Sequence, residues 1–186
     1  MPDRLTDDSL AAVLVHGLQP TRVVLVEHDP RWSDRFAARA AELARALGSR
    51  ARFVEHVGST AVPGLAAKPV VDVVVGIDDP DDEPAYLPDL EAIGYQVRVR
   101  EPGHRCLRAG EPDEPVNLHC YSPGDDEVRR MLAFRDRLRA DPGDRLRYEQ
   151  AKRELAQREW RDMNYYAEAK HPTIAAILRN AGWPDG

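Results

Sequence analysis

The stretch that follows His56 combines residue types and spacing that suit a phosphate-binding turn. Gly58 comes directly after a short stretch typical of a strand, and a glycine there lets the backbone approach a ligand closely. Ser59 and Thr60 add hydroxyl groups and backbone N–H groups, the donors that bind phosphate oxygens. The pattern predicts that Gly58, Ser59 and Thr60 bind the phosphate groups of a small anionic ligand.

Lys68 and Asp72 place two charged groups close behind this turn. Lys68 offers a positive point charge, and Asp72 offers a hard oxygen ligand of the kind that Mg²⁺ prefers. A magnesium ion held there would bridge the protein and the phosphates. The alternative is structural: residues 58–64 form a tight turn, and Asp72 is a buried acid hydrogen-bonded to nearby backbone. A Walker A loop is excluded, because Gly64 is followed by Leu65 instead of a lysine.

A second set of polar residues alternates along 116–121. Successive side chains of a strand point to opposite faces, so Asn117, His119 and Tyr121 share one face. We expect this polar face to point toward the ligand. His119 would then be a metal ligand or a general base near neutral pH, with Asn117 as its hydrogen-bond partner. A structural histidine is the alternative.

Three cationic residues near the C-terminal end are further candidates for phosphate binding. Lys152 lies four residues after Tyr148, and Lys170 lies four after Tyr166, so each pair shares one helical face. Either lysine could reach a phosphate; the alternative is an exposed lysine that lies along a tyrosine ring. Arg135 either binds an anion or pairs with an aspartate on its own helix.

The elements that must position these residues follow from the apolar periodicity and the turn residues. Apolar positions every three or four residues predict helices, and short β-branched stretches between glycines and prolines predict strands. We expect helices at 7–16, 30–48, 85–93, 146–166 and 173–178, another from 125 onward, and strands at 23–26, 53–57, 69–77, 95–100, 105–109 and 116–121. The order predicts an α/β fold of the α+β type, with a mixed sheet flanked by helices and a helical C-terminal segment.

Length and composition bound the class of protein. The chain has 186 residues, which is typical of one domain, and we expect a short N-terminal extension at 1–20 before a domain at 21–186. The formal net charge of −6 argues against a polymeric nucleic acid as partner, since polyanion binding needs a cationic face. The expected partners are therefore small molecules.

The ends and the cysteines point to a reducing compartment. No apolar run approaches the roughly 20 residues of a membrane helix. Residues 1–8 contain three aspartates and no apolar core, so they do not act as a secretory signal, and a cytoplasmic location is expected. Two cysteines, Cys106 and Cys120, are too few for a disulfide framework or a cysteine zinc site.

The segment HVGSTAVPGLAAKP, which spans 56–69 and is followed by Asp72, resembles the GrpB family. Phe134, Arg135 and Asp136, together with the Asn-Leu-His run at 117–119, also match, and the resemblance covers residues 22–181. The GrpB family is related to the nucleotidyltransferase superfamily, which implies a nucleotidyltransferase-like fold.

In the wider superfamily, a Gly-Ser turn precedes a strand that bears two alternate metal-binding carboxylates. Gly58 and Ser59 match the turn, and Asp72 matches the first carboxylate, but Val74 occupies the position of the second. One carboxylate cannot hold the two metal ions that clamp attacking and leaving oxygens. Either another residue, such as His119, completes the site, or the transfer reaction is lost.

Two functions follow from these matches. The first is Mg²⁺-dependent transfer of a nucleoside monophosphate from a nucleoside triphosphate to a small acceptor, with Asp72 and His119 as metal-binding and catalytic residues. The second is a non-catalytic module that binds a nucleotide or coenzyme. GrpB-like domains also occur joined to dephospho-coenzyme A kinases, so the resemblance implies an accessory role near coenzyme A synthesis as one form of this second function.

Overall fold

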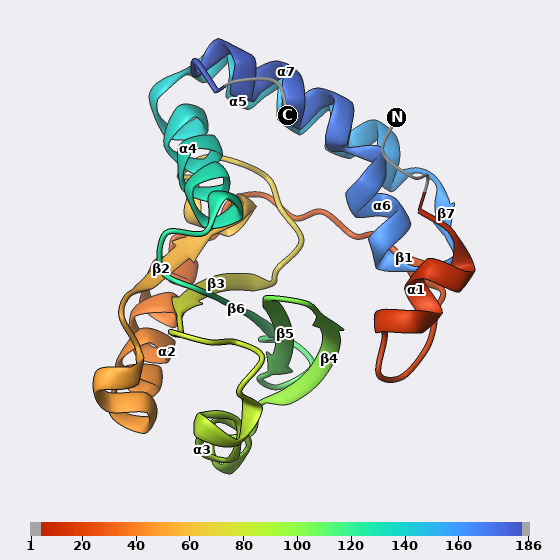
Figure 1. Cartoon of the computed structure of the whole chain (residues 1–186). Helices are drawn as coiled ribbons and strands as arrows, with labels where there is room; N and C mark the ends of the chain where they lie inside the picture. Colours follow the sequence, from red (N-terminus) through yellow and green to blue (C-terminus); the bar gives the residue numbers. More distant parts are fainter. Residues whose placement is uncertain (1–4, 184–186) are drawn as a thin grey trace.

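The computed structural model describes residues 5–183, in which helices cover both faces of a mixed sheet (Figure 1). In chain order the elements are α1 (Asp7–Val13), β1 (Thr21–Arg22), α2 (Arg31–Leu47), η1 (Gly48–Arg50), β2 (Val54–Val57), η2 (Ser59–Ala61), β3 (Val71–Gly76), η3 (Glu83–Ala85), α3 (Leu87–Ala92), β4 (Gln96–Glu101), β5 (His104–Ala109), β6 (Val116–Tyr121), α4 (Asp126–Ala140), α5 (Pro142–Ala156), β7 (Glu159–Trp160), α6 (Met163–Ala169) and α7 (His171–Asn180). The expected α/β architecture with a helical C-terminal segment is confirmed.

The main sheet has five strands in the order β2-β3-β6-β5-β4. Strands β3 and β6 run parallel, and the other neighbours run antiparallel. In this register Asp72 of β3 lies opposite Asn117 of β6, which lies opposite Arg108 of β5. Val74 lies opposite His119 in the same way. The sheet therefore brings the polar residues of three strands onto one face.

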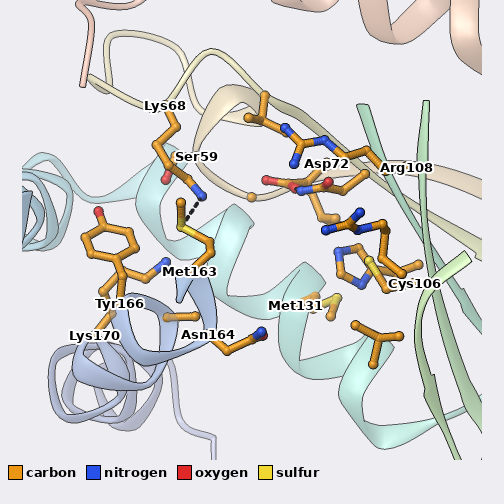
Figure 2. A pocket seen from close by; sticks show the side chains of 18 of the residues that line it. Ser59, Lys68, Asp72, Cys106, Arg108, Met131, Met163, Asn164, Tyr166 and Lys170 are labelled. Atoms are coloured by element: carbon orange, nitrogen blue, oxygen red, sulfur yellow. Dashed lines mark hydrogen bonds between the residues drawn. The ribbon is translucent and has the colours of Figure 1, made fainter. Parts of the chain in front are cut away.

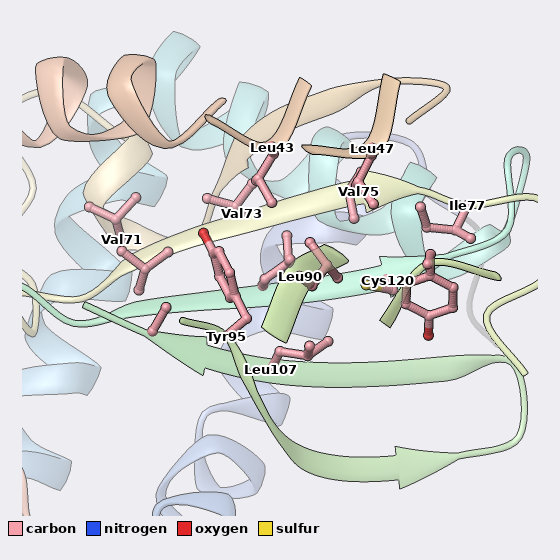
Figure 3. Packing of buried hydrophobic residues seen from close by; sticks show 14 of the residues in the cluster. Leu43, Leu47, Val71, Val73, Val75, Ile77, Leu90, Tyr95, Leu107 and Cys120 are labelled. Carbon is pink, nitrogen blue, oxygen red and sulfur yellow. The ribbon is translucent and has the colours of Figure 1, made fainter. Parts of the chain in front are cut away.

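The opposite face of the sheet carries the largest apolar core (Figure 3). Val71, Val73 and Val75 of β3 point into it, where they pack with Leu43 and Leu47 of α2 and with residues of α3. The three valines and the two leucines are at most 2% exposed. Their alternation with Asp72 explains how a valine-rich central strand presents one carboxylate to the other face.

The C-terminal helices cover the polar face by packing on the loop that follows β2. Val62 and Leu65 of this loop pack with Leu138 of α4, Tyr148 of α5 and Ile177 of α7. The carbonyl oxygen of Ala61 accepts a hydrogen bond of 2.9 Å from Nε of Arg139. Hence the predicted phosphate-binding turn lies between the sheet and the helices.

The predicted single helix at 146–166 is wrong, because the chain breaks between α5 and α6. Residues 159–160 form β7, in which Trp160 pairs with Thr21 of β1. The carboxylate of Asp162 then accepts a hydrogen bond of 2.9 Å from the backbone N–H of Asn164 and caps α6. Pairing with a distant strand overrides the local helical periodicity here.

The predicted strand at 23–26 is also wrong for the most part. The residues that pair with another strand are Thr21 and Arg22, which form β1 just before the predicted range. Val26 forms only an isolated bridge with Ala67. The helix expected at 85–93 is shorter than predicted and is preceded by the 3₁₀ turn η3. Within residues 5–183, no helix is both long enough and apolar enough to cross a membrane.

Residues 10–15 pack against the edge of the sheet. Leu10 of α1 is buried, and Leu14 forms an antiparallel bridge with Val99 of β4. The N–H of Val15 donates to the carbonyl oxygen of Arg98 at 3.0 Å. The division into an extension at 1–20 and a domain at 21–186 stays a prediction.

Candidate functional site

A cavity of about 610 Å³ lies between the polar face of the sheet and the C-terminal helices. Its lining includes the turn at Gly58, residues of β3, β5 and β6, and side chains of α4, α5 and α6 (Figure 2). Met131, Phe134 and Met163 provide apolar surface, and several lysines and arginines provide charge. A cavity of this size suits a small organic ligand.

Gly58 and Asp72 meet in this cavity. Gly58 adopts φ +70°, a backbone conformation that L side chains rarely adopt. A Cβ atom at Gly58 would lie 2.4 Å from Oδ2 of Asp72. Only glycine therefore fits both the conformation and the space, and the carboxylate of Asp72 lies against the turn instead of facing the apolar core.

Asp72 is held by an amide and not by a second acid. Nδ2 of Asn117 donates a hydrogen bond of 2.9 Å to Oδ1 of Asp72. Val74, one pleat further along β3, is fully buried in an apolar cluster with Val57 and Val128. The strand therefore supplies one carboxylate to the cavity and places an apolar side chain where a second carboxylate would stand.

Three ammonium groups line the cavity without a strong anionic partner. Within residues 5–183, none of Lys68, Lys152 and Lys170 forms an ion pair with a carboxylate. Nζ of Lys68 contacts the thioether of Met163 at 2.9 Å, which Figure 2 marks with a dashed line. Nζ of Lys170 lies 4.8 Å from the ring centroid of Tyr166. Thioethers and ring faces are weak partners for a cation, so these charges favour binding of an anion.

Lys152 is the most deeply buried of the three. Its side chain is 2% exposed, and Nζ donates to Oγ of Ser59 at 3.0 Å and to the carbonyl oxygen of Ala66. Nζ also lies 4.8 Å from the ring centroid of Tyr148. Lys152 therefore joins α5 directly to the predicted phosphate-binding turn.

Burial lowers the pKa of these lysines. Desolvation, followed by the charge of Lys170, lowers the pKa of Lys152 to about 7. Desolvation also lowers the pKa of Lys68 to about 8, although the negative charge of Asp72 acts in the opposite direction. An uncompensated buried charge is costly, and a bound anion would remove that cost.

The cavity brings together most of the residues that the sequence singled out. Gly58, Ser59, Thr60, Lys68, Asp72, His119 and Lys152 all line it. Arg135 lies outside this lining: its guanidinium donates to Glu55, to Asp136 and to the carbonyl oxygen of His56. Its position favours the structural role. Thr60 is buried, and its hydroxyl contacts Nε2 of His56 at 3.0 Å.

Lys170, the other C-terminal lysine that the sequence offers as a candidate, also lines the cavity. Its ammonium does lie over Tyr166, as the spacing suggests, but it lines the cavity instead of standing on the open surface. The amino-acid composition contains a signal that points to Lys170. The chain contains 23 arginines and only three lysines, Lys68, Lys152 and Lys170, and all three line this one cavity. Arg108 of β5 also lines the cavity, and its local sequence pattern does not predict it.

Strand β3 does not offer carboxylates for two magnesium ions. Within residues 5–183, no group of three or more His, Cys, Asp and Glu side chains is arranged to hold a metal. Mg²⁺ commonly binds through one or two carboxylates together with substrate phosphates and water. Asp72 offers such an oxygen beside the turn, but the neighbouring Val74 offers none.

Comparison with known proteins gives consistent matches over nearly the whole chain. The family model described as GrpB protein matches residues 22–180. A UPF0157 protein of Halalkalibacterium halodurans is 46% identical over 181 residues, which cover 95% of this chain and 92% of that protein. A dephospho-CoA kinase of Mycolicibacterium paratuberculosis is 31% identical over 191 residues, covering 87% of this chain and 47% of that protein.

A solved structure agrees with these matches. The crystal structure of the conserved protein GrpB from Enterococcus faecalis superposes with a TM-score of 0.73 at 32% sequence identity. The superposition covers 85% of this chain and 96% of that one. Because the sequence match and the shared fold both extend over most of the chain, this chain belongs to the GrpB family.

Proposed function

We propose that this protein is a binding module for the phosphate groups of a nucleotide or coenzyme. The observation that carries the proposal is the convergence of Lys68, Lys152 and Lys170 on one cavity without carboxylate partners in the described part of the chain. Ser59 and the backbone of the Gly58 turn add hydroxyl and N–H donors beside them. Charge-assisted hydrogen bonds to such a cluster are the strong interactions that phosphate recognition uses.

The test is a calorimetric titration of the protein with ATP, AMP and dephospho-coenzyme A. Dephospho-coenzyme A is included because relatives named dephospho-CoA kinase share this region. We expect Lys152→Met to weaken binding about 10- to 100-fold, since a hydrogen bond to a charged group contributes about 1.5–3 kcal/mol. Methionine has a similar volume and removes a buried charge, so the fold is expected to persist.

Arg147→Met is the matched control for this experiment. Arg147 is exposed on the same helix α5 and does not line the cavity, so its loss also removes one positive charge. We expect it to leave affinity within about twofold, because surface charges are screened by salt. Equal weakening by both variants would mean that net charge, and not the cavity, attracts the ligand.

A second candidate function is transfer of a nucleoside monophosphate from a nucleoside triphosphate to a small hydroxyl-bearing or phosphorylated acceptor. The position of Asp72 against the Gly58 turn and within the cavity favours it. When bound, one Mg²⁺ at Asp72 would neutralise phosphate charge. Ser59 and the lysines would orient the phosphates, and Asn117 would hold the Asp72 carboxylate in place.

Metal dependence separates the two functions. We compare ATP affinity with Mg²⁺ and with a chelator, in the parent protein and in Asp72→Asn, and then analyse the products after incubation with ATP and a mixture of small hydroxyl-bearing and phosphorylated acceptors. Transfer requires Mg²⁺-dependent binding that Asp72→Asn removes, together with release of pyrophosphate. Affinity that is the same in all four measurements supports the binding module alone.

A further inference from the structure

A chain of hydrogen bonds runs from the surface to the cavity through two histidines. Oε2 of Glu101 lies 2.8 Å from Nδ1 of His104, and Nε2 of His104 lies 3.2 Å from Nδ1 of His119. Glu101 is half-exposed, and the side chain of His104 is 13% exposed. His119 lines the cavity, whereas Glu101 and His104 do not.

The sheet builds this chain. Cys106 of β5 lies opposite His119 of β6, and His104 lies opposite Tyr121, so these four side chains share the cavity face. The rings of His104 and Tyr121 stack with centroids 4.4 Å apart and an angle of 9° between their planes. The two imidazole planes also differ by only 9°, which suits a hydrogen bond in the plane of both rings.

The order of donors along the chain follows from what each group can do. An ionised carboxylate only accepts, so Nδ1 of His104 must carry the proton that it donates to Glu101. With one proton on each imidazole, Nε2 of His104 is left as an acceptor. Nδ1 of His119 must then be the donor. The remaining nitrogen of His119, Nε2, is then an acceptor.

The ionisation of Glu101 agrees with this order of donors. The hydrogen bond from His104 lowers the pKa of Glu101, so this carboxyl is ionised at neutral pH.

We propose that Glu101 and His104 hold His119 as the Nδ1–H tautomer, so that Nε2 of His119 accepts a hydrogen bond from a hydroxyl group of the bound ligand. This inference rests on the proposed phosphate binding for the identity of the ligand. Asp72 and His119 are both acceptors, whereas the three lysines are donors. The cavity therefore selects a phosphorylated polyol, such as a nucleotide with a free ribose, with its phosphates at the lysines and its hydroxyls at Asp72 and His119.

Long-range ¹H–¹⁵N correlation spectra of the full ¹⁵N-labelled chain test the tautomer directly. The measurement is made at about pH 8, where imidazoles are mostly neutral. We expect a protonated Nδ1 and an unprotonated Nε2 for His119, with the signals assigned by their loss in His119→Gln. A protonated Nε2, which is the form that free imidazole side chains favour in water, would overturn the proposal.

Two variants separate positioning from packing. His104→Phe keeps an aromatic ring against Tyr121 but removes the hydrogen bonds, and we expect His119 to lose its preference for Nδ1–H. Glu101→Gln keeps an acceptor oxygen for His104, and the tautomer is expected to persist. A signature of His119 that is unchanged in His104→Phe would show that His104 does not position it.

The hydrogen bond from a ligand hydroxyl to Nε2 of His119 is tested by adding AMP and its 2′,3′-dideoxy analogue to the same sample. We expect AMP to move the His119 Nε2 signal in the direction of a hydrogen-bond acceptor and the dideoxy analogue to bind without moving it. Binding of AMP with no change at Nε2 overturns the hydroxyl contact. Failure of AMP to bind contradicts the proposed function instead, and the tautomer measurement still decides the positioning role.

Discussion

At the scale of single residues, the site depends on close contacts that leave no room for substitution. Gly58 is the sharpest case, because its positive φ and its approach to Asp72 are two separate constraints on the same residue. The same contact places the carboxylate beside the turn, where a phosphate or a hydroxyl would bind. The positive φ and the close approach to Asp72 therefore explain why a glycine precedes Ser59.

Gly58→Ala is expected to destabilise the protein more than Gly64→Ala. Both glycines have positive φ, of +70° and +76°, but a Cβ at Gly64 would meet no atom within 4 Å. The backbone strain, about 1–3 kcal/mol, is common to both variants. Urea unfolding of both proteins measures the difference, which reports the clash with Asp72. Equal destabilisation would mean that Asp72 moves away from the added Cβ atom without a loss of stability.

Val74→Asp is expected to destabilise the fold and not to create a second metal ligand. Val74 is fully buried with Val57 and Val128, and an unpaired buried charge costs several kcal/mol. Thermal unfolding with and without Mg²⁺ measures both effects. A variant as stable as the parent protein, with tighter Mg²⁺ binding, would show that this side chain reaches the cavity.

At the scale of elements, the break between α5 and α6 shapes the cavity. A continuous helix would carry 159–169 straight on, but β7 and the cap at Asp162 turn the chain so that α6 lines the cavity with Met163, Asn164 and Tyr166. Asp162 is 5% exposed and also accepts a hydrogen bond of 2.8 Å from the backbone N–H of Gln19.

Asp162→Ala is expected to cost more stability than Asp125→Ala. Each variant removes a helix N-cap, which contributes about 1 kcal/mol. Asp125 caps α4 through the N–H of Glu127, whereas loss of Asp162 also leaves the N–H of Gln19 without its acceptor. We therefore expect the additional loss of one hydrogen bond, about 0.5–1.5 kcal/mol, in Asp162→Ala. Urea unfolding curves of the two variants make the comparison, and similar midpoints would contradict it.

At the scale of the whole molecule, the charges are arranged unevenly. The chain carries a net charge of −6, yet its three lysines lie around one cavity. Arginines make the surface ion pairs, as with Arg153 and Glu149 on α5. The acidic surface therefore coexists with a local cationic site, which explains how an acidic protein can bind a small anion.

The pH dependence of stability is expected to report the buried lysine. The folded-state pKa of Lys152, about 7, lies below its ordinary value of 10.5. Between these values the unfolded chain binds a proton that the folded chain lacks, so the free energy of unfolding rises with pH across this window. The parent protein should therefore gain stability relative to Lys152→Met from about pH 7 to about pH 10, as urea unfolding at several pH values measures. A constant difference across this range would show that Lys152 is charged in the folded state throughout.

Local sequence patterns were enough to predict the family resemblance, the α/β class, the central valine-rich strand and most of the cavity residues. These depend on local patterns: alternation places Asp72 on one face, and a glycine after a strand marks the turn. Tertiary structure decided what local patterns do not encode. Packing of α5 against the turn buried Lys152 on Ser59, pairing of β1 with β7 broke a predicted helix, and cross-strand register joined His119 to His104. Each of these contacts joins residues far apart in the chain or on separate strands, so its energy depends on the assembled fold and leaves no trace in local periodicity.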